Sequence, residues 1–455
     1  MTRRIDDRTG AALRRPRRAA LAGATALGGA GLLAVAAYAG DQTLTGSITE
    51  QVVADTNYQL NPGDDGTIGS ETGLVLNYAN AGPTDSLTLR GAMRYSAYTG
   101  DAHDNIAGLF PNVSGAYRRQ RTDRGFDLGF SLSVKPVEYN STSFVLLPVD
   151  PDDPDIDPDD EPEVGLVQRD DETLRADFAV NGGYTYRVNS HESLSFNASA
   201  RRTDYLDDTG GRYTPSNALD FSAGWSRQLR ASWTTGVTAG ITNIVTDDDA
   251  KRDTTTVFAT PQLGYQPTPT QTFDFSLGPS LTFLRGGGRD DEITPGIRAS
   301  IGASYVTGPT SFSASASNST RPSDEGVSSN VASLRASVSR RLDATQSLTA
   351  GARASLQTPL DDDGGDGEIR RVSLNGGYNI EINDRVSGRA GVGWAYTDDS
   401  GGTESAYSAS GGLSYLLTEE TSANLGYVFR VEDSTGEATS HRVTLSLRRN
   451  FTLLP

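Results

Sequence analysis

Histidine is the first place to look for catalytic chemistry, because the chain has only three histidines and no cysteine. His441 directly follows Ser440, and a serine hydrolase needs a histidine within hydrogen-bond reach of its serine, with a third group to orient it. Neighbouring residues of a strand point to opposite faces, so these two side chains would not meet. His103 lies in an expected loop and His191 in an expected turn. We therefore predict that the protein is not an enzyme and uses no cofactor.

Two acidic segments, residues 150–163 and 361–366, have the residue types that bind Ca²⁺ or Mg²⁺. Neither has the EF-hand spacing of alternating Asp, a Gly and a distant Glu. In the first segment repeated Pro prevents regular structure and the carboxylates repel one another. We predict a solvated acidic extracellular loop over residues 140–171 and no specific metal site, while bridging to lipopolysaccharide through divalent ions stays open.

Arginine is the third candidate, because it recurs at polar positions that alternate with apolar residues. Arg binds carboxylate and phosphate through its planar fork, and rings of Arg favour anions inside a pore. The same faces hold the acids Asp177, Asp220, Asp274 and Glu381. Two interpretations remain: these arginines line a path for anions, or they pair with nearby acids. The residues are Arg90, Arg94, Arg175, Arg187, Arg201, Arg298, Arg335, Arg353, Arg371, Arg389 and Arg448.

The elements that must position these arginines alternate apolar and polar residues with period two. In residues 87–95, Leu87, Leu89, Gly91, Met93 and Tyr95 share one face, and the polar residues share the other. No helix would place them on one side. Segments of about 11 to 15 residues suit tilted membrane strands. The pattern recurs in residues 126–134, 174–186, 273–283 and 372–382.

The connections alternate between short and long, which is the periplasmic-turn and extracellular-loop asymmetry of outer-membrane barrels. With this rule we count about twenty strands, within about two either way, from near Leu44 to near Phe451. The short connections are residues 81–85, 189–192, 267–270, 343–346, 383–384 and 418–421. The long ones are residues 99–108, 140–171, 206–216, 247–252, 285–294, 359–367, 398–403 and 433–437.

The N-terminus has the order of a secretory signal: seven arginines between Arg3 and Arg18, an apolar run from Ala19 to Ala37, then the small-x-small triplet Ala37-Tyr38-Ala39. We predict a cleaved signal peptide over residues 1–39 and a single barrel domain over residues 40–455. The mean hydropathy of −0.43 fits strands of which only alternate residues face lipid. A net charge of −18 argues against nucleic acid as a partner.

Three weak motifs carry a family resemblance: the opening segment Ile48–Tyr58, polar hairpins such as Thr345–Leu348, and the final strand, in which Val443, Leu445, Leu447 and Phe451 alternate with polar residues. The chain resembles the outer-membrane β-barrel porins that often accompany exopolysaccharide gene clusters in Gram-negative bacteria. That resemblance implies a barrel without catalytic residues. The terminal aromatic also resembles the signal read by the barrel-assembly machinery, although four residues follow Phe451.

The expected fold is therefore an all-β, up-and-down antiparallel barrel in the cell outer membrane, with lipid and lipopolysaccharide around it. Barrels of this size leave a water-filled or loop-plugged lumen. The expected function is passage of small hydrophilic or anionic solutes, with export of an acidic polysaccharide as the narrower version. A structural or adhesive surface barrel with a plugged lumen is the alternative. A plugged receptor and an autotransporter are disfavoured, because the alternation covers nearly the whole chain.

Overall fold

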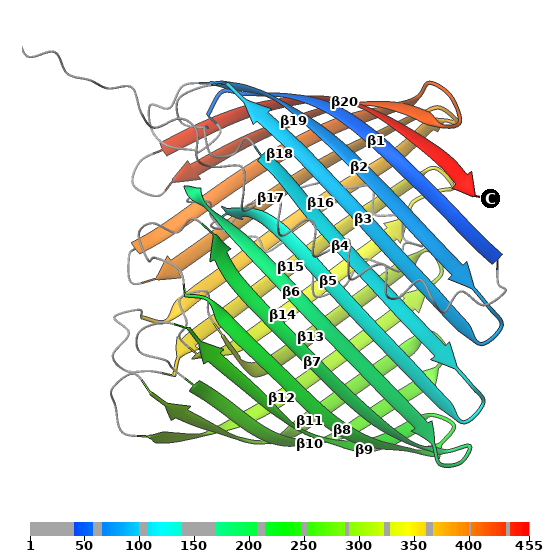
Figure 1. Cartoon of the computed structure of the whole chain (residues 1–455), viewed down its shortest axis with the longest axis vertical. Coiled ribbons are helices and arrows are strands. Elements are labelled where there is room, and N and C mark those ends of the chain that lie inside the picture. Colours follow the sequence, from blue (N-terminus) through cyan, green and yellow to red (C-terminus); the bar gives the residue numbers. More distant parts are fainter. Residues whose placement is uncertain are drawn as a thin grey trace, which may run out of the picture.

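Twenty antiparallel strands form one closed barrel in the computed structural model (Figure 1). The structure describes residues 41–57, 66–99, 108–138, 169–206, 214–247, 253–286, 291–322, 328–360, 367–399, 402–433 and 437–454. Residues 1–39, residues 140–168, residues 361–366 and His103 lie outside these ranges, and with them the expected signal peptide, the second acidic cluster and most of the acidic loop expected over residues 140–171. The last three residues of that expected loop belong instead to a strand that begins at Arg169. No helix among the described residues is long and apolar enough to span a membrane.

The strands follow one another around the barrel in chain order. The first ten are β1 Asp41–Asp55, β2 Thr67–Ala81, β3 Asp85–Tyr98, β4 Gly108–Gln120, β5 Arg124–Glu138, β6 Arg169–Arg187, β7 Glu192–Leu206, β8 Ser216–Arg230, β9 Trp233–Thr246 and β10 Asp253–Thr268. The others are β11 Gln271–Arg285, β12 Glu292–Thr307, β13 Thr310–Pro322, β14 Ser328–Arg341, β15 Gln346–Pro359, β16 Ile369–Asn383, β17 Val386–Asp399, β18 Gly402–Leu416, β19 Thr421–Asp433 and β20 Glu437–Leu454.

Pairing between β1 and β20 closes the barrel, from Asp55 opposite Arg442 to Leu44 opposite Leu454. The predicted fold class and strand number are confirmed. The first and last strands are longer than expected, since β1 begins at Asp41 and β20 ends at Leu454. Polar strand ends break the apolar alternation, so the sequence pattern locates the middle of a strand better than its ends.

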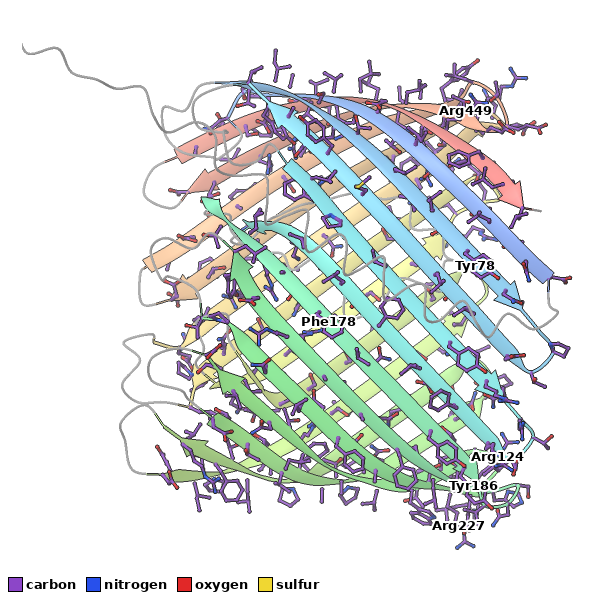
Figure 2. All side chains as sticks on the ribbon, viewed as in Figure 1. Tyr78, Arg124, Phe178, Tyr186, Arg227 and Arg449 are labelled. Carbon is purple, nitrogen blue, oxygen red and sulfur yellow. The ribbon has the colours of Figure 1, made fainter. Side chains whose placement is uncertain are left out.

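Large apolar side chains project from the outside of the wall and are exposed there. Phe178, Leu334 and Val392 are 45%, 56% and 63% exposed, and Tyr78, Phe178 and Tyr186 stand on the outer surface in Figure 2. The apolar face predicted for residues 87–95 is this outer face, because Met93 and Tyr95 are among the exposed side chains. An apolar outer band is what a barrel in lipid requires.

Aromatic and basic side chains mark the edge of this band at the end with the short turns. On the outside of β9, β10 and β11, Trp233 stacks on Tyr265 at 4.2 Å between ring centroids, and Tyr265 on Phe273 at 6.2 Å. Arg124, Arg227 and Arg449 lie at the same end of the barrel (Figure 2). Amphipathic rings and long cations favour the level of lipid headgroups.

The six short turns expected from the alternation are confirmed, and the turn between β12 and β13, which was not among them, is short as well. Gly308 has a φ of 55° and, with Pro309, makes the two-residue turn between β12 and β13; only glycine adopts this left-handed conformation readily. In the turn after β14, the Asp343 carboxylate accepts hydrogen bonds from the Thr345 backbone N–H and hydroxyl, at 2.8 and 2.9 Å. These bonds lower the pKa of Asp343 below its ordinary value.

A close approach between β1 and β20 explains why residue 46 of β1 is a glycine. We call this junction, which closes the barrel, the seam. A Cβ built on Gly46 would lie 2.5 Å from the Phe451 ring and 2.9 Å from Leu76. The aromatic ring of the last strand therefore lies over the bare backbone of the first. This contact uses the aromatic residue that the sequence singled out in the final strand.

Candidate functional site

The inner face of the wall is the candidate site, and all eleven predicted arginines lie on it. The inner face is defined here by the strand positions that alternate with the exposed apolar residues of the outside. In β14, for example, Leu334 and Val338 are outward and exposed, which turns Arg335 inward. The same alternation turns Arg90 and Arg94 of β3, Arg175 and Arg187 of β6, Arg201 of β7, Arg298 of β12, Arg353 of β15, Arg371 of β16, Arg389 of β17 and Arg448 of β20 inward.

Three of these arginines come together on neighbouring strands. Arg335 of β14 is directly opposite Arg353 of β15. Arg371 of β16 is opposite Ser355, the next inward residue after Arg353 on β15. Directly opposite residues have Cβ atoms about 5 Å apart. We call Arg335, Arg353 and Arg371 the arginine cluster. The Arg371 Nη1 also donates to the Gln357 Oε1 at 3.3 Å.

Two other predicted arginines lie over aromatic rings. The Arg298 guanidinium carbon is 4.0 Å from the centre of the Phe258 ring, and that of Arg94 is 5.4 Å from the Phe110 ring. Phe258 and Phe110 are buried inward-facing residues. Guanidinium groups are attracted to the face of an aromatic ring within about 6 Å. These contacts hold two cations at defined places on the inner face.

Two predicted arginines, Arg175 and Arg448, contact a polar side chain of their own strand. The Arg175 Nε lies 2.9 Å from the Asp177 Oδ2, and the Thr203 hydroxyl donates to the same carboxylate at 2.9 Å. Near the short-turn end, the Arg448 Nε donates to the Asn450 Oδ1 at 3.1 Å. For Arg175, therefore, the interpretation as the partner of a nearby acid is the one the contacts favour.

The remaining four arginines lie apart from the cluster. Arg187 ends β6, and its Nη1 donates to the Thr122 carbonyl oxygen at 3.5 Å. Arg90 is opposite Asn77 and Ser114, and Arg201 is opposite Ala179 and Ala218. The Arg389 side chain lies over Gly412 of β18, where an added Cβ would be 2.9 Å from its Nε. The structure thus distributes the predicted residues around the inner face and concentrates only three of them.

The sequence count missed charged residues of both signs on the inner face. It assigned the polar ends of the strands to loops or left them out, although the same alternation continues into them. Basic residues stay in excess on the described inner face. The missed acids are Asp41, Asp55, Glu71, Asp127, Glu292, Asp399, Glu404 and Glu432, and the missed bases are Arg118, Lys135, Arg230, Arg341, Arg430 and Arg442.

Asp55 is the most deeply buried of the missed acids, with a side chain 1% exposed. Its carboxylate lies at the end of the seam away from the short turns, 3.3 Å from Arg430 and 3.5 Å from Arg442. It accepts a hydrogen bond from the Ser440 hydroxyl at 2.7 Å. We call these four residues the seam cluster. Charged side chains are buried only when paired and hydrogen-bonded, so this group joins β1 to β19 and β20.

Ser440 and His441 point to opposite faces, as predicted. Ser440 belongs to the seam cluster on the inner face, whereas the His441 Nδ1 on the outer face lies 2.8 Å from the Tyr427 hydroxyl. The pair therefore has no hydrogen bond through which the histidine could activate the serine. His191 lies in the turn between β6 and β7, also as predicted.

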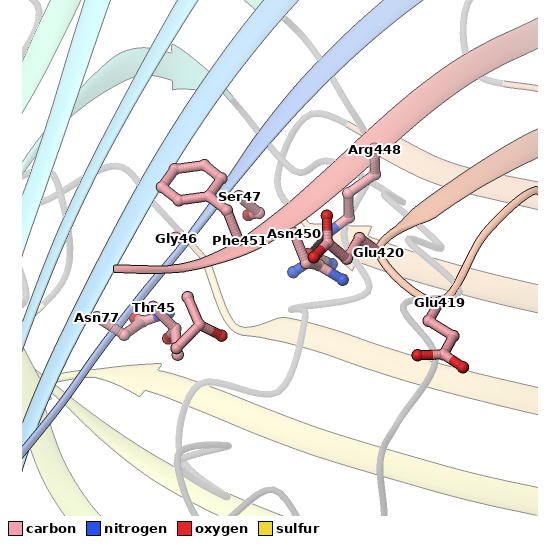
Figure 3. A pocket seen from close by; sticks show the side chains of 10 residues that line it. Thr45, Gly46, Ser47, Asn77, Glu419, Glu420, Arg448, Asn450 and Phe451 are labelled. Atoms are coloured by element: carbon pink, nitrogen blue, oxygen red, sulfur yellow. Dashed lines mark hydrogen bonds between the residues drawn. The ribbon is translucent and has the colours of Figure 1, made fainter. Parts of the chain in front are cut away.

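A cavity of about 340 Å³ lies at the opposite end of the seam (Figure 3). Thr45, Ser47 and Asn77 line one side, and Arg448 lines the other. The turn after β18 contributes Glu420, whose carbonyl oxygen accepts a hydrogen bond from the Asn450 N–H at 2.7 Å. Around the described strands and turns, no three His, Cys, Asp or Glu side chains converge as metal ligands would.

Comparison with solved structures gives the class of fold. The barrel resembles the FrpB iron transporter of Neisseria meningitidis, with a TM-score of 0.52 and 8% identity over 91% of this chain and 83% of that one. It also resembles the ferric-catecholate import receptor Fiu of E. coli, with a TM-score of 0.51 and 11% identity over 89% of this chain and 81% of that one. The chain thus has the closed-barrel fold of these transporters. No protein-family model matches it, and no curated protein does.

Proposed function

We propose that the chain is an outer-membrane channel through which small hydrophilic solutes pass, with a preference for anions. The apolar outer band and its aromatic edge support a place in lipid, and the inner face of twenty strands is wide enough for an aqueous path. The two similar structures are an iron transporter and an import receptor, which supports a channel role in general. Lipopolysaccharide as a neighbour and the barrel-assembly machinery as a folding partner belong to the same proposal.

The arginine cluster is the observation that carries the preference for anions. Arg335 and Arg353 are opposite each other, which brings two guanidinium groups to one place on the inner face and makes the potential there more positive. A carboxylate, phosphate or sulfate group of a passing solute can accept the forked hydrogen bonds of guanidinium groups. An acidic polysaccharide would present such groups repeatedly, which makes its export the narrower form of the proposal.

The experiment is planar-bilayer recording of the refolded barrel under a salt gradient, which reads ion selectivity from the reversal potential. We expect anion-selective steps in the wild type. Replacing the arginine cluster by R335Q, R353Q and R371Q together should move the reversal potential toward cations, because the potential inside the pore becomes less positive.

The matched control removes three arginines from the outer face: R202Q, R340Q and R370Q. These side chains alternate with the inward residues of β7, β14 and β16, so the control should keep the wild-type reversal potential. Equal shifts in both triple variants would assign the selectivity to the overall charge of the protein. A correctly folded barrel that passes no current would overturn the channel proposal and favour a structural or adhesive surface barrel.

A further inference from the structure

A second part of the inner face, on strands that precede those of the arginine cluster, forms a cavity that is almost uncharged. A cavity of about 510 Å³ lies across β8 to β12, within the range of small-molecule sites. It reaches the turn residues Ala231 and Ser232 between β8 and β9, so it opens near the end of the barrel with the short turns. Its inward side chains are almost all amides and hydroxyls.

Asp274 of β11 is the one charged group among the described side chains that line this cavity. It is opposite Gly264 of β10 and Gly302 of β12. No neighbouring strand therefore places a side chain directly beside the Asp274 carboxylate. A Cβ on Gly264 would lie 3.3 Å from the Asp274 Oδ1, so the glycine keeps one side of that oxygen open. The exposed carboxylate can accept hydrogen bonds from two hydroxyl groups at once.

Three amide side chains line the same cavity: Gln228 of β8, and Gln262 and Gln266 of β10. The Gln262 Nε2 donates to the Thr238 Oγ1 at 2.9 Å, which orients that amide. Ser276 and Ser300 lie beside Asp274 along the wall, with their hydroxyl oxygens 2.7 Å apart. The cavity therefore offers both donors and acceptors at closely spaced positions.

The charge pattern selects the ligand class. A carboxylate on the wall of the cavity repels anions, and a single carboxylate among neutral groups is a weak site for a metal cation. A neutral molecule with several adjacent hydroxyl groups can satisfy the carboxylate with its O–H donors and the amides with both its donors and its acceptors. We propose that this cavity is a binding subsite for a neutral saccharide on the wall of the channel.

This inference rests on the proposed function, because the saccharide is taken to be a solute of the same channel. The test measures binding and conductance separately. Maltotriose is titrated by calorimetry into the refolded barrel in detergent, and the same preparation is then recorded in bilayers. We expect saturable binding to the wild type and binding about tenfold weaker in D274N, the loss that follows removal of one hydrogen bond to a charged group.

The matched control is D220N, which neutralises another inward aspartate. Asp220 lies on β8 outside the cavity and accepts hydrogen bonds from Ser199 and Thr242 at 3.1 and 2.7 Å. We expect D220N to bind maltotriose as the wild type does, and Q262A with Q266A to weaken binding further than D274N alone. Equal losses in D274N and D220N, or no saturable binding to the wild type, would overturn the subsite. If those results came with normal conductance, the subsite would fail while the channel proposal stood.

Discussion

Asp55 and Arg430 form an ion pair of 3.3 Å although 375 residues separate them. The contact joins the end of β1 to β19, across the strand that closes the barrel. Arg442 and Ser440 complete the seam cluster from β20. The group holds the first strand against the last two at the outer end of the barrel.

The first prediction is that D55N destabilises the barrel. Arg430, whose side chain is 12% exposed, would keep its charge without the carboxylate, and so would the more exposed Arg442; breaking a buried pair in this way costs about 3–5 kcal/mol. The free energy of unfolding in urea, measured in lipid vesicles, checks this. As a control, D204N removes the carboxylate of the exposed Arg202–Asp204 pair at 3.2 Å and should cost less than about 1 kcal/mol. Equal stability of D55N and D204N would contradict the role of the seam cluster.

The second prediction concerns the two faces of β14. Leu334 faces outward and is 56% exposed, whereas the neighbouring Ser333 faces inward and shares a hydrogen bond of 2.9 Å with Ser317. We expect L334R to lower the free energy of unfolding in vesicles by about 2–4 kcal/mol, the cost of a cation facing lipid near the midplane.

The control for this prediction is the same new residue one position earlier. S333R loses one hydroxyl contact but keeps its cation in the aqueous interior, so its cost should be clearly smaller. If S333R were the more damaging of the two, the assignment of inner and outer faces would be reversed.

The third prediction tests the packing of Phe451 over Gly46. G46V places methyl groups where the ring lies, and such overpacking costs about 1–3 kcal/mol. Combining it with F451A should recover part of the loss, because the obstructing ring is gone. G91V is the matched control: Gly91 is also an outward glycine, and an added Cβ there meets nothing within 4 Å. A G46V barrel as stable as G91V would mean that the ring moves aside without cost.

Alternation in the sequence was sufficient to predict the faces of the strands, and the inward side of all eleven arginines follows from it. That Arg335 and Arg353 are opposite each other required the register across the turn of residues 342–345, which depends on where each strand ends. The polar ends of the strands carry no apolar alternation, so the sequence does not determine the last residue of each strand.

The seam cluster could not be predicted from the sequence, for a different reason. Asp55 is an ordinary acid near the end of an opening segment, and only closure of the barrel brings Arg430 and Arg442 to it. The cavity at Asp274 was missed because its signal is the absence of side chains at Gly264 and Gly302. Glycine in a strand indicates close approach or open space, and the sequence does not distinguish between the two.

The seam cluster also favours one partner for the first strand. Asp55 comes from β1, whereas Arg430, Ser440 and Arg442 come from the last two strands. The Asp55 carboxylate loses its hydration at no net cost only where these partners replace the water. The cluster therefore stabilises the pairing of β1 with β20 and gives no such support to a pairing of β1 with a strand that lacks these partners.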